Sequence, residues 1–92
     1  MEISLTHIKE QIKDGNIEAA IYGLNQYIQE KQDCNDEPFY LLGNAYRKRG
    51  DWQLALNNYL EAIERNPESP AIHARKMLMD ILEFYNKDMY NQ

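Results

Sequence analysis

The chain has 92 residues, of which 43% are hydrophobic and 27% are charged, which is enough for one folded domain and too few for two. No apolar run approaches the roughly 18 residues of a membrane span, and the single cysteine, Cys34, cannot form an internal disulfide. The net charge is −5, whereas a nucleic acid or an anionic membrane would require a positive surface, so neither is expected as a partner.

Apolar residues recur every three to four positions along the chain, which predicts α-helices and no strands. The first predicted helix covers about residues 4–13 and ends at the turn-forming triplet Asp14-Gly15-Asn16. The second covers about residues 17–31. Their inward faces are expected to carry Leu5, Ile8 and Ile12, then Ala20, Ile21, Leu24, Tyr27 and Ile28.

Residues 32–36 are polar and predict a loop. The third helix then opens at about residue 37 with Asp36 as its cap and ends at Gly50, while the fourth covers about residues 52–65 with Asp51 as its cap. Ser69 and Pro70 stand in the order that begins a fifth helix. The residues expected to face inward are Phe39, Leu42, Ala45 and Tyr46, then Leu54, Ala55, Tyr59, Ala62 and Ile63, and finally Ala74, Met77, Leu78, Ile81, Leu82 and Tyr85.

Helices joined by short connections pack antiparallel, so this order predicts an all-α fold of two helical hairpins followed by a single helix. The two hairpins also repeat each other. The first and third helices align at an offset of 34 residues, and the second and fourth align at an offset of 35. A helix–turn–helix unit of this period is typical of tetratricopeptide repeats.

Residues 36–67 carry the strongest part of this pattern: Phe39-x2-Leu42-Gly43-x2-Tyr46, then Ala55-x3-Tyr59, Ala62 and Pro67. This spacing closely resembles the tetratricopeptide-repeat (TPR) signature, with small residues where the two helices cross. The resemblance is full for residues 36–67 and partial for residues 2–33. It is weakest after Ser69, where the last helix resembles a cap.

The resemblance implies an α-α superhelix of TPR type in one domain, residues 1–92. Repeat one would cover about residues 2–35, repeat two about residues 36–69, and the capping helix and tail about residues 70–92. The end of the chain also resembles that of small bacterial single-domain TPR proteins. The implied function is a non-enzymatic protein-interaction module, a scaffold or adaptor, that binds a peptide or protein segment in a concave groove.

In TPR domains the first helix of each pair lines that groove. The resemblance therefore places Tyr40, Asn44, Arg47 and Lys48 of the third helix there, with Arg75 of the fifth; Thr6, Glu10 and Lys13 of the first helix, and Ala71 and Leu78 of the fifth, would lie beside them. Amide and guanidinium donors suit carboxylates, so an extended acidic peptide is the expected partner.

Two other interpretations of these residues stay open. Asn44 and Arg75 match residue types of the clamp with which some TPR domains hold the terminal carboxylate of a chaperone, but Thr6 and Tyr40 stand where basic residues would be needed. Alternatively, the cations at positions 47–49 are a solvated helix end that interacts favourably with the helix dipole.

The tail contains Phe84, Tyr85, Met89 and Tyr90, four large apolar residues near the end of a polar chain. Three surfaces are available to them: the protein's own groove, a second copy, or a partner protein. Alternatively, the fifth helix simply extends and covers the exposed end of the fourth helix. The alternative function is therefore a small structural subunit that homo-oligomerises through its Met- and Tyr-rich C-terminal helix and tail. The protein is expected to be a monomer or a weak homo-oligomer.

No catalytic, metal or cofactor site is expected. The histidines, His7 and His73, and Cys34 are scattered along the chain, and His7 with Glu10 is a lone pair rather than a ligand cluster. The glycines form no phosphate-binding loop. Residues 1–4 lack the features of a secretory signal, which together with the single thiol predicts a cytoplasmic protein.

Overall fold

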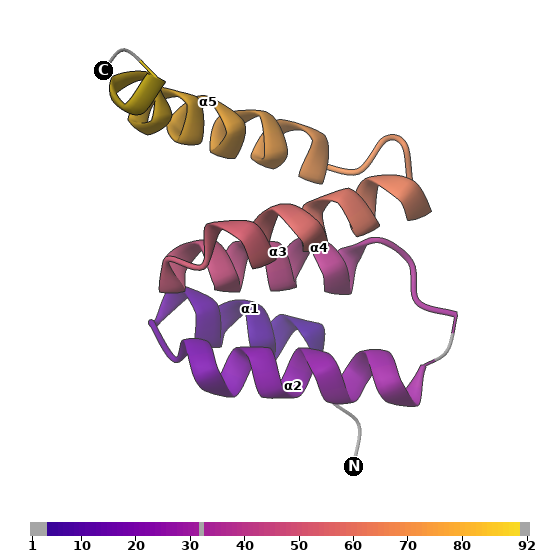
Figure 1. The fold of residues 1–92 in the computed structure, drawn as a ribbon. Helices are drawn as coiled ribbons and strands as arrows, with labels where there is room; N and C mark the ends of the chain where they lie inside the picture. Colours follow the sequence, from indigo (N-terminus) through magenta and orange to yellow (C-terminus); the bar gives the residue numbers. More distant parts are fainter. Residues whose placement is uncertain (1–3, 32, 91–92) are drawn as a thin grey trace.

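The computed structural model describes residues 4–31 and 33–90, and the side-chain surroundings of residues 4–31 and 33–84. The helices are α1 (Leu5–Lys13), α2 (Ile17–Glu30), α3 (Glu37–Arg49), α4 (Trp52–Arg65) and α5 (Ala71–Tyr90). Each helix runs antiparallel to the one before it, so α1, α3 and α5 share one direction and α2 and α4 the other (Figure 1). The predicted all-α fold of two helical hairpins and a fifth helix is confirmed.

The turns inside the two hairpins both depend on glycine. Gly15, between α1 and α2, has φ 89°, and Gly50, between α3 and α4, has φ 93°. Residues with a Cβ atom rarely adopt this left-handed backbone, and a glycine in it commonly ends a helix. The short connections that make each pair of helices antiparallel therefore follow from the position of these two glycines.

Side-chain capping matches the prediction at α5 and differs at α3 and α4. Ser69 is buried, and its Oγ accepts a hydrogen bond from the backbone N–H of Ala71 at 3.1 Å. Asp36 and Asp51 occupy the cap positions of α3 and α4 but make no capping hydrogen bond through their side chains. Before α3, Asn35 Oδ1 instead accepts from the N–H of Glu37 at 3.0 Å.

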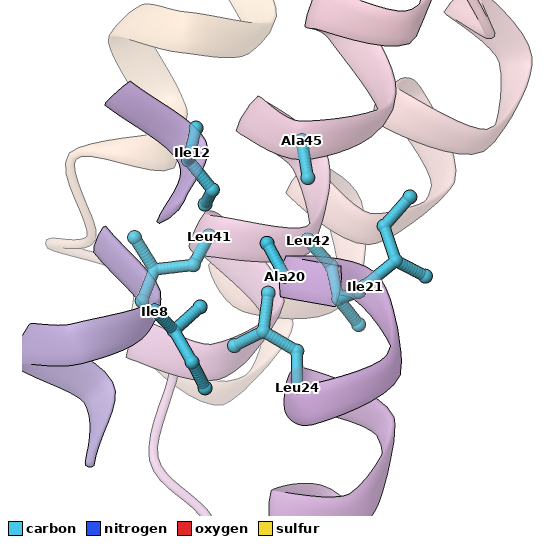
Figure 2. Close-up of a cluster of buried hydrophobic side chains, with 8 residues drawn as sticks. All are labelled: Ile8, Ile12, Ala20, Ile21, Leu24, Leu41, Leu42 and Ala45. Carbon is cyan, nitrogen blue, oxygen red and sulfur yellow. The ribbon is translucent and has the colours of Figure 1, made fainter. Parts of the chain in front are cut away.

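One hydrophobic cluster joins the first hairpin to α3 (Figure 2). Ile8 and Ile12 of α1, and Ala20, Ile21 and Leu24 of α2, meet Leu41, Leu42 and Ala45 of α3. Leu41 was not among the residues expected to face inward, yet only 4% of its surface is exposed. It is buried because α3 packs against the first hairpin on one side and against α4 on the other.

A second cluster joins α3, α4 and α5. It contains Phe39 from α3, Ala55, Tyr59 and Ala62 from α4, and Ala71 and Leu78 from α5. Gly43 lies against the Tyr59 ring, and a Cβ atom on Gly43 would overlap that ring. The close helix crossing predicted at Gly43 and Ala55 is therefore present.

Two residues predicted to face inward do not. Leu54 is 41% exposed and Met77 is 56% exposed. Each precedes a fully buried residue, Ala55 or Leu78, and a helix turns by about 100° per residue, so its side chain lies at the margin of the packed face. Other expected core residues are only half-buried: Leu5, Tyr27, Ile28, Tyr46, Ile63, Ala74, Ile81 and Leu82. The side chain of Tyr85 lies outside the described residues.

Polar contacts also attach the first hairpin to α3. Lys9 Nζ of α1 lies 3.4 Å from Glu37 Oε2, and Arg49 Nη1 lies 2.8 Å from Glu18 Oε1 of α2. Lys48 Nζ donates a hydrogen bond to the Ile12 carbonyl at 3.2 Å, near the end of α1. These contacts lie at both ends of α3, so they restrain the orientation of the two hairpins relative to each other.

Candidate functional site

The face of α3 predicted to bind a peptide carries Tyr40, Asn44 and Arg47, three half-buried residues at helical spacing. The structure brings them together around the hydroxyl group of one α4 residue, Tyr59. The Tyr40 and Tyr59 ring centroids are 6.2 Å apart, and the ring planes are inclined at 40°. The Tyr59 hydroxyl donates a hydrogen bond to Asn44 Oδ1 at 2.6 Å.

Tyr59 is the largest fully buried side chain of the described residues, and its surroundings change its acidity. Burial raises the pKa of Tyr59 to about 12 because the phenolate would lose its hydration. Arg47 acts in the opposite direction, through its positive charge and a hydrogen bond. The phenol therefore keeps its proton at neutral pH and remains a hydrogen-bond donor.

Arg47 on α3 and Arg75 on α5 share an unusual feature. The Nε atom of each is buried, and among the described residues neither atom finds a hydrogen-bond partner. A buried donor without a partner costs about 1–3 kcal/mol, more when it belongs to a charged group. Both arginines therefore have unused hydrogen-bonding capacity in their present surroundings.

Lys48 has a different contact from the other predicted groove residues. Its side chain reaches α1, where Nζ donates to the Ile12 carbonyl. Arg49 bonds to Glu18 and Asp51, and its guanidinium lies 5.0 Å from the centroid of the Tyr46 ring. These two cations link the helices of the protein to one another, so the basic end of α3 is more than a solvated segment.

The flanking groove residues divide into two groups. Thr6, Glu10 and Lys13 of α1 are exposed. Ala71 and Leu78 of α5 are fully buried in the second hydrophobic cluster, so the expectation that they line a groove is wrong. They are covered because α5 packs on α4 through this face.

A separate apolar surface lies where α4 begins. A hollow of about 470 Å³ is lined by residues 50–54 and by Leu82 of α5. Trp52 and Leu54 are the large apolar residues of α4 in this lining, and both are partly exposed. Of the predicted C-terminal contact residues, Phe84 is 71% exposed. The side chains of Tyr85, Met89 and Tyr90 lie outside the described residues.

The residues considered for catalysis or metal binding lie on different elements. His7 on α1 and His73 on α5 are exposed, and Cys34 is half-buried in the loop before α3, with Sγ donating to the Lys31 carbonyl at 2.7 Å. Within the described ranges, no group of three or more metal-binding side chains is present. None of the helices described there is both long and apolar enough to cross a membrane.

Sequence reasoning assigned Tyr59 only to packing and missed its polar role. A signal for that role was present, since a tyrosine rather than a phenylalanine stands at this position and Asn44 lies opposite it on the partner helix. The hollow beside Trp52 was also missed, because its lining combines a turn with a residue 30 positions away. No periodic pattern along the chain reports such a combination.

Comparisons with known proteins agree with the helical-repeat fold. Residues 43–75, from the middle of α3 to the start of α5, match the sequence profile described as TPR repeat. The solution NMR structure of Bacteroides fragilis protein BF1650 is 60% identical in sequence and superimposes with a TM-score of 0.86, covering 99% of this chain and 92% of that one. No match is found among curated proteins.

Proposed function

The chain belongs to the tetratricopeptide-repeat family, and from this premise we propose that it is a non-enzymatic protein-interaction module that binds an acidic peptide segment. The binding face would be formed by α3 and α5, with Tyr40, Asn44, Arg47 and Arg75 as its contact residues. Membership of the family supports the general function, protein interaction. The polar residues of this face indicate the chemical class of the partner, an acidic peptide.

The observation that carries the proposal is the pair of buried arginine Nε atoms without partners, on Arg47 and Arg75. They lie on α3 and α5, which both pack on α4 and run in the same direction (Figure 1). A carboxylate can accept two hydrogen bonds from one guanidinium group, and such charge-assisted bonds are about twice as strong as neutral ones. Because the Nε atoms themselves are covered, an acidic side chain would pair with the terminal nitrogens of these two half-buried guanidinium groups.

The contribution of Lys48 to binding is expected to be smaller than that of the arginines. Its Nζ already donates to the Ile12 carbonyl, so a peptide would compete with an existing hydrogen bond. The Tyr40 ring, half-buried beside Tyr59, offers a flat surface for the apolar stem of a glutamate or for the peptide backbone.

The direct test is calorimetric titration with hexaglutamate, acetylated and amidated at its ends so that only side-chain carboxylates are offered. Arg75→Gln and Arg47→Gln should each weaken binding about tenfold or more, the effect of losing a hydrogen bond to a charged group. Lys76→Gln is the matched control, because it removes the same charge one residue further along α5 from an exposed position.

Equal losses in Arg75→Gln and Lys76→Gln would show that only net charge matters and would reject a defined site. Failure of the natural protein to bind hexaglutamate more tightly than hexaglutamine would reject the acidic partner itself. Circular dichroism of each variant should show unchanged helicity, since the substituted side chains lie at the margin of the core.

A second candidate function, self-association, is favoured by the hollow at residues 50–54. Leu82 lies beside the start of α4, yet α5 continues to Tyr90, a further eight residues or about 12 Å of helix. Because α4 and α5 are antiparallel and Leu82 lies beside the first residues of α4, residues 83–90 extend beyond the end of α4. We propose that the extension of a second copy covers the hollow, and reciprocally.

Leu54→Asp tests this candidate, with Leu60→Asp as its matched control. The two leucines are 41% and 43% exposed on the same helix, but only Leu54 lines the hollow. Light scattering should show a concentration-dependent dimer for the natural protein and for Leu60→Asp, and a monomer for Leu54→Asp. A natural protein that stays monomeric at high micromolar concentration would remove this candidate.

A further inference from the structure

Resting on the proposed function, we infer that Tyr59 is a positioning residue that makes the α3–α5 face selective for anions, because its hydroxyl fixes the direction in which the Asn44 amide presents its donors. Tyr59 itself would not touch the peptide. It would act through Asn44, by deciding whether the NH₂ group or the oxygen of that amide is available to a ligand.

The position of the Tyr59 hydroxyl is fixed by packing. The residue is fully buried, and its ring lies against Gly43, where there is no room even for a Cβ atom. Ala55 and Ala62, one turn away on either side of Tyr59 along α4, are fully buried in the same cluster. The ring therefore has no free space in which to change rotamer, and its hydroxyl stays beside Asn44.

The direction of the hydrogen bond follows from the groups around the hydroxyl. A phenol has one proton to donate, and Arg47 beside it can only donate, since a guanidinium has no acceptor. The hydroxyl therefore accepts from the side of Arg47 and gives its own proton to Asn44. Only the amide oxygen can receive it, which matches the 2.6 Å contact between Tyr59 Oη and Asn44 Oδ1.

With its oxygen directed at Tyr59, the Asn44 amide presents Nδ2, with two N–H donors, on its opposite side, where a ligand would meet it. The arginines of the same face are also donors without acceptors. The face then presents hydrogen-bond donors from Asn44, Arg47 and Arg75. These donors complement a carboxylate and offer no acceptor to a cationic side chain. Without the hydroxyl, the Asn44 amide could rotate by half a turn, present its oxygen to the peptide and repel a carboxylate.

Tyr59→Phe tests this effect, since it keeps the buried ring and removes only the hydroxyl. The change also releases Arg47, but an additional free donor would favour hexaglutamate and so cannot cause the expected loss. The probes are hexaglutamate and hexaglutamine with blocked ends, titrated into the full chain. We expect the affinity for hexaglutamate to fall about five- to tenfold, the usual range for one lost hydrogen bond, while the affinity for hexaglutamine changes little. The glutamate-to-glutamine preference should therefore fall. A purely structural role of Tyr59 would lower both affinities together.

Tyr46→Phe is the matched control, because it removes a hydroxyl from a half-buried tyrosine of α3 that is outside the proposed binding face. It should leave the preference unchanged. If Tyr59→Phe keeps the natural preference while Arg75→Gln loses it, the inference about Tyr59 is overturned and the proposed function stands. If Arg75→Gln also leaves the affinity for hexaglutamate unchanged, the proposed function itself is wrong.

A second measurement uses the natural protein and does not depend on the folding of a variant. In NMR spectra, the side-chain NH₂ resonances of Asn44 should shift during titration with hexaglutamate and remain in place during titration with hexaglutamine. Asn44 resonances that stay fixed while hexaglutamate binds would overturn the inference.

Discussion

The two helical hairpins have the same architecture but achieve their close approach in opposite ways. In the second hairpin the glycine is on the first helix, where Gly43 lies against the Tyr59 ring. In the first hairpin it is on the second helix, where Gly23 faces Ile8, and a Cβ atom there would lie 3.3 Å from Ile8 Cδ1. Lys9, at the position aligned with Gly43, is exposed. Each hairpin therefore has a glycine at its close approach, but on opposite helices of the pair.

The two crossings also differ in polarity. In the second hairpin the side chain that fills the crossing is a tyrosine of α4, and its hydroxyl reaches Asn44 on the outer part of α3. The residue of α2 aligned with Tyr59 is Leu24, which is buried in an entirely apolar cluster. The position aligned with Tyr59 therefore carries a polar group only in the second hairpin.

The largest expected effect concerns the Gly43 crossing. Gly43→Leu should lower the free energy of unfolding by about 3 kcal/mol, the upper part of the usual range for overpacking, because the Tyr59 ring cannot move aside. Urea unfolding followed by circular dichroism measures this change.

Alanine at each glycine sharpens the contrast between the hairpins. Gly23→Ala should stay within about 1 kcal/mol of the natural protein, since alanine favours a helix over glycine and the contact is with the mobile end of Ile8. Gly43→Ala should be clearly destabilising. Equal effects at both positions would contradict the comparison.

At alkaline pH we expect an effect of intermediate size on the free energy of unfolding. Tyr59 has a folded-state pKa of about 12 against an ordinary value of 10.0, so between these values the folded protein holds a proton that the unfolded chain has released. The stabilising contribution is complete below pH 10 and is lost as the pH rises through 12. Tyr59→Phe should show a smaller loss of stability over this range than Tyr46→Phe does.

Ultraviolet absorbance provides an independent check of this titration. The chain has seven tyrosines, and the ionisation of one of them should be delayed to about pH 12 in the folded protein. That late component should be absent from Tyr59→Phe. If the late component persists in that variant, its assignment to Tyr59 is wrong.

The smallest expected effect concerns the attachment of the hairpins to each other. Arg49 of α3 bonds to Glu18 of α2 and to Asp51, and these hydrogen bonds raise the pKa of Arg49. Arg49→Gln should slightly lower the melting temperature at low ionic strength. Salt screens exposed ion pairs, so the difference from the natural protein should disappear in high salt. An equal loss at both salt concentrations would indicate that Arg49 acts through packing on Tyr46.

Much of the helix organisation could be predicted because it depends on residues near one another in the chain. Gly15 and Gly50 end helices through their own backbone freedom, and regular apolar spacing defines the faces of α1 and α3. The crossing of Gly43 with Tyr59 was also predictable, since the TPR pattern records which positions meet. The caps at Asp36 and Asp51 were not, because Asn35 and Arg49 provide competing contacts.

The candidate site was predictable in its residue types and less so in its contacts. Tyr40, Asn44 and Arg47 share one face of α3 by helical spacing alone. That Lys48 bonds to α1, and that Ala71 and Leu78 are covered by α4, depends on helices distant in sequence.

The sequence by itself determined five helices, their turns and a repeat whose small residues permit close packing, because backbone preference and apolar spacing act locally. Only the tertiary structure decided that Leu54 borders a hollow, that two arginines keep buried donors without partners, and that the Asn44 oxygen is held by Tyr59. The physical reason is that burial and hydrogen-bond direction depend on which groups from other helices occupy the neighbouring space.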